Sequence, residues 1–178
     1  YYLMSPLNII FLLTPFRYLD LAVTLLILIR YGLAGWSMGF YLRNMQESSL
    51  GRILIFSTSY ALSGYLVNYQ FNLMWIDGFI LLPLICLGLE RILKGKSPAL
   101  YIITLALCLI SNYYIAFMVC LFMILYFFYR LPAHVEREDW KKESFQLAVH
   151  FAGSSLLAAG IGAFILIPTF VQLMQSKA

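Results

Sequence analysis

The sequence predicts an all-α fold, a polytopic transmembrane helical bundle, and three observations point to it. The 178 residues are 62% hydrophobic and 11% charged, with a mean hydropathy of +0.85. Soluble domains are about 45–50% apolar and about 25% charged, so this composition excludes a soluble globular domain and a disordered chain. The apolar residues form runs long enough to cross a hydrocarbon core of about 30 Å as helices. Short polar or charged segments separate these runs.

The expected spans follow from the positions of the apolar runs. Residues 1–18 are apolar but contain Pro6 and Pro15, which favour short interfacial helices on the extracytoplasmic side over one straight span. Residues 130–144 are rich in charge, and we expect a cytoplasmic loop there. We therefore treat residues 1–178 as a single transmembrane domain. The expected spans cover about residues 19–42, 53–69, 72–93, 99–129 and 145–169.

The orientation of the spans follows from the cations. Lys and Arg gather in short loops on the cytoplasmic side of membrane proteins. The loops at residues 43–52, 91–96 and 130–142 are basic, whereas the turn at residues 68–72 has no Lys or Arg. We expect the three basic loops inside, and the 68–72 turn and residues 1–18 outside. On this interpretation the net charge of +4 is a topology signal and does not indicate nucleic-acid binding.

The apolar stretch at residues 99–129 is too long for one upright helix. At 1.5 Å per residue it would extend about 46 Å, against about 30 Å for the hydrocarbon core. Both flanking loops are basic, so we expect a short re-entrant or broken helix pair, 99–111 and 113–129, that turns at Ser111–Asn112. The alternative is one tilted helix with the charged loop outside, which breaks the charge pattern.

Two charged residues, Arg30 and Asp77, lie inside expected spans, where charge is costly. On a functional interpretation both face a water-filled cavity open to the outside. Asp77 then contacts substrate or belongs to an acid–base or metal site, and Arg30 binds a phosphate through bidentate hydrogen bonds. The alternatives without a chemical role are a buried ion pair between the two, Asp77 bonded to a helix end, and Arg30 extending to the interface.

Amide and aromatic side chains surround Asp77 at the predicted outer end of the bundle. Amide groups and aromatic faces suit a sugar or a lipid-phosphate head group. The alternative for Tyr and Trp is an interfacial aromatic belt, to which Asn and Gln do not belong. The candidate substrate-binding residues are Arg30, Asn68, Gln70, Asn72, Trp75, Asp77, Asn112 and Tyr113.

The remaining polar and sulfur-containing residues are expected to have structural roles. Glu90 and Arg91 are interpreted as a local pair at the cytoplasmic end of their span. The three Cys lie inside apolar runs, and the sequence has no CxxC or Cys/His cluster. We therefore expect no metal site and no cofactor.

The run from residue 60 to residue 90 resembles the YfhO family of bacterial membrane proteins. Its most specific motif is NxxWID, from Asn72 to Asp77, followed by LPL at 82–84 and GLER at 88–91. The resemblance covers essentially the whole chain. The other similar segments are YYLMSPLN (1–8), RYGLAG (30–35), LISNYYIAFMVCLFMILYF (109–127) and AFILIPT (163–169).

This resemblance implies a GT-C-like fold and a function. The YfhO family is similar to the GT-C glycosyltransferases, which use a polyprenyl-phosphate sugar donor on the extracytoplasmic face. The resemblance implies transfer of a sugar to a cell-envelope polymer such as teichoic acid, by a multi-pass protein of the bacterial plasma membrane. The implied partners are the lipid bilayer, the donor and the cell-wall polymer acceptor, with no nucleic acid.

The resemblance also implies that a residue is missing. The GT-C class usually keeps its catalytic Asp in the first outer loop, so we expect the catalytic residue upstream of Tyr1 and interpret the chain as an N-terminal fragment. The alternative function is a membrane transporter or permease for a lipid or small solute. Transporters often contain repeats with paired broken helices, whereas this sequence predicts one broken stretch.

Overall fold

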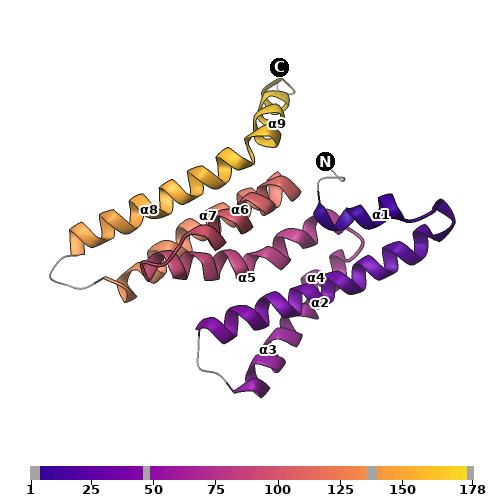
Figure 1. The fold of residues 1–178 in the computed structure, drawn as a ribbon, viewed down its shortest axis with the longest axis horizontal. Helices are drawn as coiled ribbons and strands as arrows, with labels where there is room; N and C mark the ends of the chain where they lie inside the picture. Colours follow the sequence, from indigo (N-terminus) through magenta and orange to yellow (C-terminus); the bar gives the residue numbers. More distant parts are fainter. Residues whose placement is uncertain (1–4, 46–48, 136–139, 176–178) are drawn as a thin grey trace.

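The computed structural model describes residues 5–45, 49–135 and 140–175, and the regular elements in this part of the chain are all helices (Figure 1). The expected all-helical fold is confirmed. Among the described residues, five helical segments are long and apolar enough to cross a membrane by length and composition. They are Phe16–Met45, Leu50–Tyr69, Leu73–Leu93, Tyr113–Ala133 and Trp140–Ile161.

Short helices precede the first long helix. The 3-10 helices η1 (Pro6–Asn8) and η2 (Phe16–Tyr18) flank the short helix α1 (Ile9–Leu13), and α2 (Leu19–Met45) follows. A proline stands at the first position of η1, and Pro15 precedes η2, which suits a residue that has no N–H to give to a helix interior. Figure 1 shows α1 lying alongside the first part of α2, with which it is in contact.

The second expected span consists of two helices, α3 (Leu50–Ala61) and α4 (Gly64–Tyr69). The sequence predicts one continuous span here, but the helix breaks at Leu62, and the extended backbone of Ser63 begins α4. Ser at this position is a strong helix-start signal. α4 is six residues long, and it leads into the polar turn before α5.

Helix α5 (Leu73–Leu93) is the centre of the bundle and contacts α2, α4, α6, α7 and α8. It contains Pro83, which has no N–H to donate to the carbonyl of Phe79 four residues earlier. The hydroxyl of Tyr60, on α3, donates to this carbonyl at 2.8 Å. An unpaired carbonyl in an apolar environment is costly, so Tyr60 compensates for the proline.

The expected broken helix pair is present as α6 (Ala99–Ser111) and α7 (Tyr113–Arg130). The backbone of Asn112 is extended, with φ −159° and ψ 105°. Its side-chain oxygen accepts hydrogen bonds from the backbone N–H groups of Tyr114 (3.0 Å) and Ile115 (3.2 Å). Asn112 therefore ends one helix and caps the start of the next.

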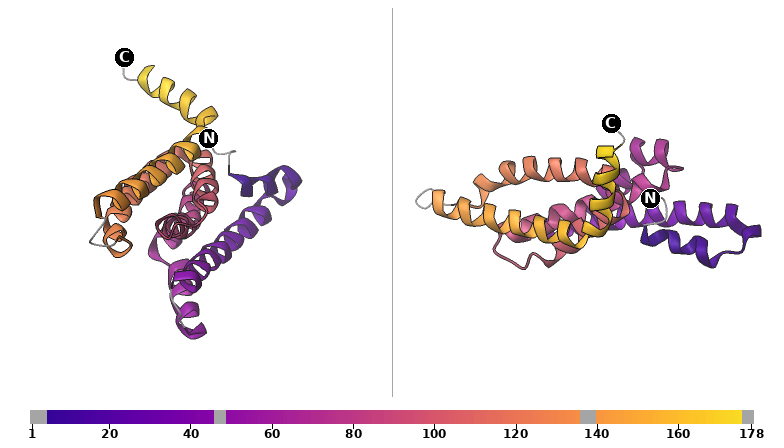
Figure 2. Two further views of the ribbon diagram at one scale, coloured as in Figure 1. Left: turned by 60° about the vertical axis from the view of Figure 1, so that its left-hand side comes forward. Right: turned by 90° about the horizontal axis from the view of Figure 1, so that it is seen from above.

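The last two helices, α8 (Trp140–Ile161) and α9 (Ala163–Gln175), differ from the sequence expectation of a charged loop to residue 144 and one span over 145–169. Helix α8 already begins at Trp140, and the chain bends at Gly162, so that α9 points away from the bundle (Figures 1 and 2). Glycine favours such a bend because it has a low helix propensity. A Cβ at Gly162 would lie 3.3 Å from the Cβ of Leu109, so the bend also lies close against α6.

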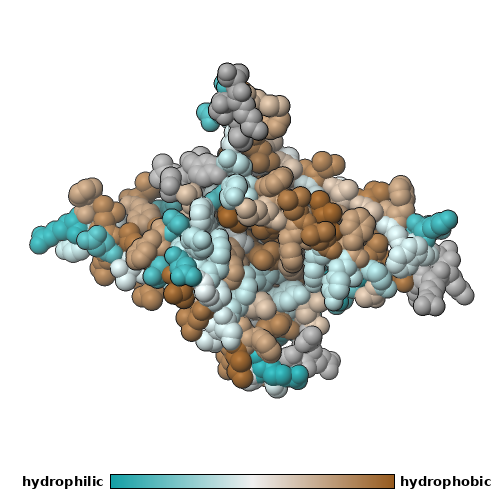
Figure 3. Space-filling model, turned by 180° about the vertical axis from the view of Figure 1, so that it is seen from behind, coloured by the Kyte–Doolittle hydropathy of each residue, from teal (hydrophilic) through white to brown (hydrophobic). Residues whose placement is uncertain are grey.

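Close packing at glycine joins the central helices. A Cβ on Gly88 of α5 would lie 2.6 Å from the backbone of Tyr101 on α6, and one on Gly78 would lie 2.3 Å from Cγ2 of Ile115 on α7. Small residues permit such close helix contacts in membranes. Outside this core the surface is largely apolar, and several of the most hydrophilic residues lie at the margins of the face in Figure 3.

The two ends of the bundle differ in charge. The C-terminal ends of α2, α5 and α7 and the start of α8 lie at the same end of the molecule (left in Figure 1), which we call the basic end. It carries Arg43, Arg91, Lys94, Lys96 and Arg130. The charge pattern of the sequence predicts that this end faces the cytoplasm.

Candidate functional site

Arg30 of α2 and Asp77 of α5 form a buried ion pair. The guanidinium Nη2 lies 3.2 Å from Oδ1 of Asp77, and the side chains are 0% and 5% exposed. Asp77 stands about one turn inside α5, and Arg30 lies near the middle of α2. Of the alternatives left open by the sequence, the buried ion pair is the arrangement that the structure contains.

The Arg30 guanidinium has further acceptors. Its Nη1 donates to the backbone carbonyl of Leu73, and Nη2 donates to Oγ of Ser5 (3.3 Å) and Oδ1 of Asn8 (3.2 Å). These contacts join the N-terminal segment, α2 and the start of α5. Burying a charge at this depth is costly unless the charge is paired and hydrogen-bonded, and four acceptors satisfy this condition. Nε of Arg30 is buried and has no hydrogen-bond partner among the described residues, so it is the one guanidinium nitrogen that could donate to a further acceptor.

Asp77 also lines a cavity of about 170 Å³, whose other lining residues are almost all apolar. The one further polar lining residue is Ser111, at the end of α6. Within the described part of the chain, the hydroxyl of Ser111 has no hydrogen-bond partner, whereas the Asp77 carboxylate interacts with Arg30 and with Ser5. Buried polar groups normally have partners. The lining residues are Pro6, Leu7, Leu33, Asp77, Ile80, Leu81, Leu107 and Ser111.

The predicted amide and aromatic residues separate into two groups. Asn112 is buried, and its Nδ2 donates to the carbonyl of Met74 at 3.2 Å, so its side chain holds the α6–α7 break against the start of α5. The other group surrounds the turn between α4 and α5. In this group Asn68 and Asn72 are exposed. Gln70 accepts a hydrogen bond from the Tyr31 hydroxyl at 3.5 Å. The ring centroid of Trp75 lies 5.2 Å from that of Tyr69.

The structure thus brings Arg30, Asp77 and Asn112 together around the first turns of α5, and it leaves the other amides on the adjacent turn. Tyr113 is half-buried and follows the break directly. Residues Ser5, Asn8 and Ser111 were not among the sequence candidates. Their signal was weak, because small polar residues in apolar runs have many roles.

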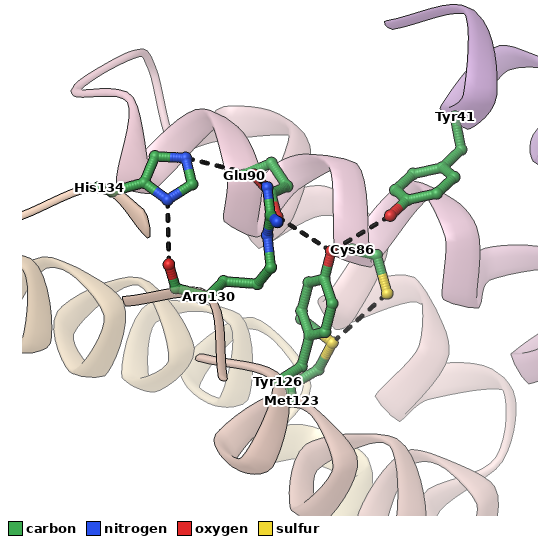
Figure 4. A network of polar contacts seen from close by, with 7 residues as sticks. All are labelled: Tyr41, Cys86, Glu90, Met123, Tyr126, Arg130 and His134. Atoms are coloured by element: carbon green, nitrogen blue, oxygen red, sulfur yellow. Dashed lines mark hydrogen bonds and ion pairs between the residues drawn. The ribbon is translucent and has the colours of Figure 1, made fainter. Parts of the chain in front are cut away.

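A second polar cluster, at the basic end, is built on Glu90 of α5 (Figure 4). This carboxylate is 1% exposed. It accepts a hydrogen bond from Nε of Arg130, another from Nη2 of Arg130 at 3.0 Å, and a third from the hydroxyl of Tyr126 at 2.9 Å. His134 Nε2 lies 3.5 Å from Oε2, and Tyr41 is 3.1 Å from the Tyr126 hydroxyl. The cluster links α2, α5, α7 and His134, which directly follows the 3-10 helix η3 (Leu131–Ala133).

The predicted local pair between Glu90 and Arg91 is therefore wrong. Consecutive helix residues do not face each other, and here Glu90 points into the bundle while Arg91 is exposed. The partner, Arg130, ends α7. The charge pattern placed Glu90 and Arg130 at the same end of the bundle, and this was the signal that could have identified the pair.

Among residues 5–45, 49–135 and 140–175, no group of three or more His, Cys, Asp or Glu side chains could hold a metal ion.

Comparison with known proteins gives the family. The family described as bacterial membrane protein YfhO matches residues 1–178. The chain belongs to the YfhO family. The uncharacterized protein YfhO of Bacillus subtilis (strain 168) is similar, with 26% identity over 132 residues, which are 74% of this chain. The match covers 15% of that relative's length. No solved structure matches the chain.

Membership of the YfhO family, together with the five candidate spans, places the chain in a bacterial membrane. The motif that most resembles YfhO, from Asn72 through Trp75 to Asp77, forms the start of α5. The YfhO-like motif and the buried ion pair therefore occupy the same place in the fold.

Proposed function

We propose that the full-length protein is a membrane glycosyltransferase of the outer face. It transfers a sugar from a polyprenyl-phosphate donor to a cell-envelope polymer such as teichoic acid. The observation that carries this proposal is the carboxylate of Asp77, which is held by Arg30 at 3.2 Å and lines a cavity. The likeness of the YfhO family to GT-C enzymes supplies the reaction type.

The chemistry of the reaction gives Asp77 a role. Transfer from a lipid-linked sugar needs an acceptor hydroxyl to be oriented and deprotonated, and it needs positive groups to stabilise the leaving phosphate. Oδ1 of Asp77 is paired with Arg30, and the carboxylate lines the cavity. We propose that the carboxylate accepts a hydrogen bond from a substrate hydroxyl. In this proposal the general base is another residue of the full-length protein.

Arg30 and the α4–α5 turn have supporting roles in this proposal. Arg30 fixes the Asp77 carboxylate, and it meets the donor phosphate if that phosphate accepts from Nε or replaces Ser5 or Asn8 as an acceptor. The exposed amides of Asn68 and Asn72 offer donors and acceptors to sugar hydroxyls, and the Trp75 ring offers a face for a sugar ring.

The test is Asp77→Asn in the full-length protein, measured as sugar transfer from a polyprenyl-phosphate donor. Asparagine keeps the size of the side chain but weakens a charge-assisted hydrogen bond, and such bonds contribute about 1.5–3 kcal/mol. We expect transfer to fall about 10- to 100-fold while the protein stays folded, because Arg30 keeps the Leu73, Ser5 and Asn8 acceptors after it loses the Asp77 charge. The matched control is Arg91→Gln, an exposed charge at the other end of α5. A folded and fully active Asp77→Asn protein would leave Asp77 a purely structural role.

A further inference from the structure

A groove separates α2 from α3 on the side that approaches the basic end. Its volume is about 630 Å³, within the range of about 300–1,000 Å³ that small-molecule sites occupy. The two helices are close at Gly35, where a Cβ would lie 3.5 Å from that of Ala61, and at Gly39, where it would lie 3.6 Å from that of Ser57. Beyond Gly39 they diverge toward the basic end (Figure 1). The lining residues are Gly35, Trp36, Gly39, Phe40, Arg43, Leu50, Ile53, Leu54 and Ser57.

The lining of the groove changes from apolar to cationic along its length. Trp36 and Phe40 form one wall, where their rings stack with centroids 5.6 Å apart and both side chains are exposed. Leu54 contributes to the opposite wall and is also exposed. Arg43, two helical turns beyond Trp36, lies toward the basic end and has no ion pair with any residue that the structure describes.

This order of groups matches an anionic lipid. A phospholipid of the inner leaflet places its phosphate at the interface and its acyl chains in the apolar layer, and the groove has Arg43 and the aromatic wall in that same order. Anionic lipids gather in the cytoplasmic leaflet and attract basic residues at the membrane surface. The segment from residue 43 to residue 52 has two Arg and one Glu, so it remains net positive.

We propose that this groove binds one anionic phospholipid of the cytoplasmic leaflet. Its phosphate contacts Arg43, and one acyl chain lies between α2 and α3 against Trp36 and Phe40. The lipid fills the space that the two helices leave as they diverge. This site is separate from the Asp77 cavity and does not depend on the proposed reaction.

The test uses the full-length protein in vesicles with two photoreactive lipids. Both lipids have a diazirine in one acyl chain; one has a phosphatidylglycerol head group and the other a phosphatidylcholine head group. Crosslinked residues are mapped by mass spectrometry. We expect phosphatidylglycerol to label Trp36, Phe40 and Leu54 about fivefold more than phosphatidylcholine, since a single basic residue near the surface contributes about a factor of five.

Two controls make the result specific. The exposed apolar residues Leu125 and Phe128 of α7 lie outside the groove, and both lipids should label them equally. In Arg43→Gln, labelling of the groove by phosphatidylglycerol should fall to the level of phosphatidylcholine. Equal labelling of the groove by both lipids in the wild type would overturn the proposal, because the groove would then hold lipid without regard to head group. Absence of groove labelling, with α7 labelled normally, would show that another protein segment covers it.

Discussion

Arg30 and Asp77 lie 47 positions apart in the sequence, yet the Arg30 Nη2 is 3.2 Å from the Asp77 Oδ1 in the interior of the bundle. The pair is asymmetric. Arg30 also has the Leu73 carbonyl, Ser5 and Asn8 as acceptors, whereas Arg30 is the only cation paired with Asp77 among the described residues. The loss of each partner should therefore have a different cost.

We predict that Arg30→Met destabilises the protein much more than Asp77→Asn. Removal of Arg30 leaves a buried carboxylate unpaired, and breaking a buried pair in this way costs about 3–5 kcal/mol. In the double variant Arg30→Met/Asp77→Leu neither charge remains, so most of that loss should be recovered. Unfolding of the full-length protein in detergent micelles measures this. A double variant as unstable as Arg30→Met would contradict the account.

The Glu90 cluster gives a prediction at the other end of α5. Glu90→Gln weakens the two hydrogen bonds from Arg130, and bonds to charged groups contribute about 1.5–3 kcal/mol each. We expect the total loss of stability to stay within about 1.5–3 kcal/mol, because the Arg130 side chain is 28% exposed and can form hydrogen bonds with water instead. Its neighbour Arg91 is exposed, so Arg91→Gln should change stability by less than about 0.5 kcal/mol. Equal effects of the two substitutions would mean that the Glu90 cluster contributes nothing specific.

The hydrogen bond from Tyr60 to the carbonyl that Pro83 leaves without a donor predicts a loss of stability when the Tyr60 hydroxyl is removed. In Tyr60→Phe the carbonyl of Phe79 loses its hydroxyl donor at 2.8 Å, and an unsatisfied buried acceptor costs about 1–3 kcal/mol. Tyr65 stacks on the same Phe79 ring, with centroids 5.5 Å apart, and Tyr65→Phe keeps that contact. Thermal unfolding of both variants is the measurement. If they melt at the same temperature, the Tyr60 hydroxyl does not compensate for the proline.

The orientation of the bundle can be tested with cysteine labelling in intact cells. We expect a cysteine at Asn68 to react with a membrane-impermeant thiol reagent, and a cysteine at Lys141 to react only after the membrane is permeabilised. Both positions are exposed, so accessibility depends on the side of the membrane. Labelling of Lys141→Cys in intact cells would reverse the topology that the basic loops predict.

The fold could be predicted from the sequence to the extent that it depends on composition and charge. Run lengths predict the helices, and the length of the 99–129 stretch, together with its two basic flanks, predicts the break at Asn112. The bend at Gly162 was missed because glycine in an apolar run, here Gly160 and Gly162, does not decide between packing and bending. The break at Leu62 was missed although Ser63 and Gly64, a dipeptide typical of turns, follow it directly, because the apolar residues on both sides together have the length of one span.

The candidate site was predictable only in part. Charge inside spans identified Arg30 and Asp77, because such charges are rare and need a partner. The sequence could not show that Arg30 would also bind Ser5 and Asn8, which requires the N-terminal segment to fold back beside α2. The partner of Glu90 was missed for a related reason: helical periodicity alone did not show which residue of another helix would face it.

The most direct test of the account is whether a sugar leaves its lipid carrier. The full-length protein in vesicles would be given a polyprenyl-phosphate donor with a labelled sugar, and an acceptor polymer on the side where Asn68 lies. The account predicts that the sugar–phosphate bond breaks, that the label moves to the polymer, and that transfer falls in Asp77→Asn but not in Arg91→Gln. If the labelled donor crosses the bilayer with its sugar still attached and the polymer gains no label, the protein is a transporter and the account is contradicted.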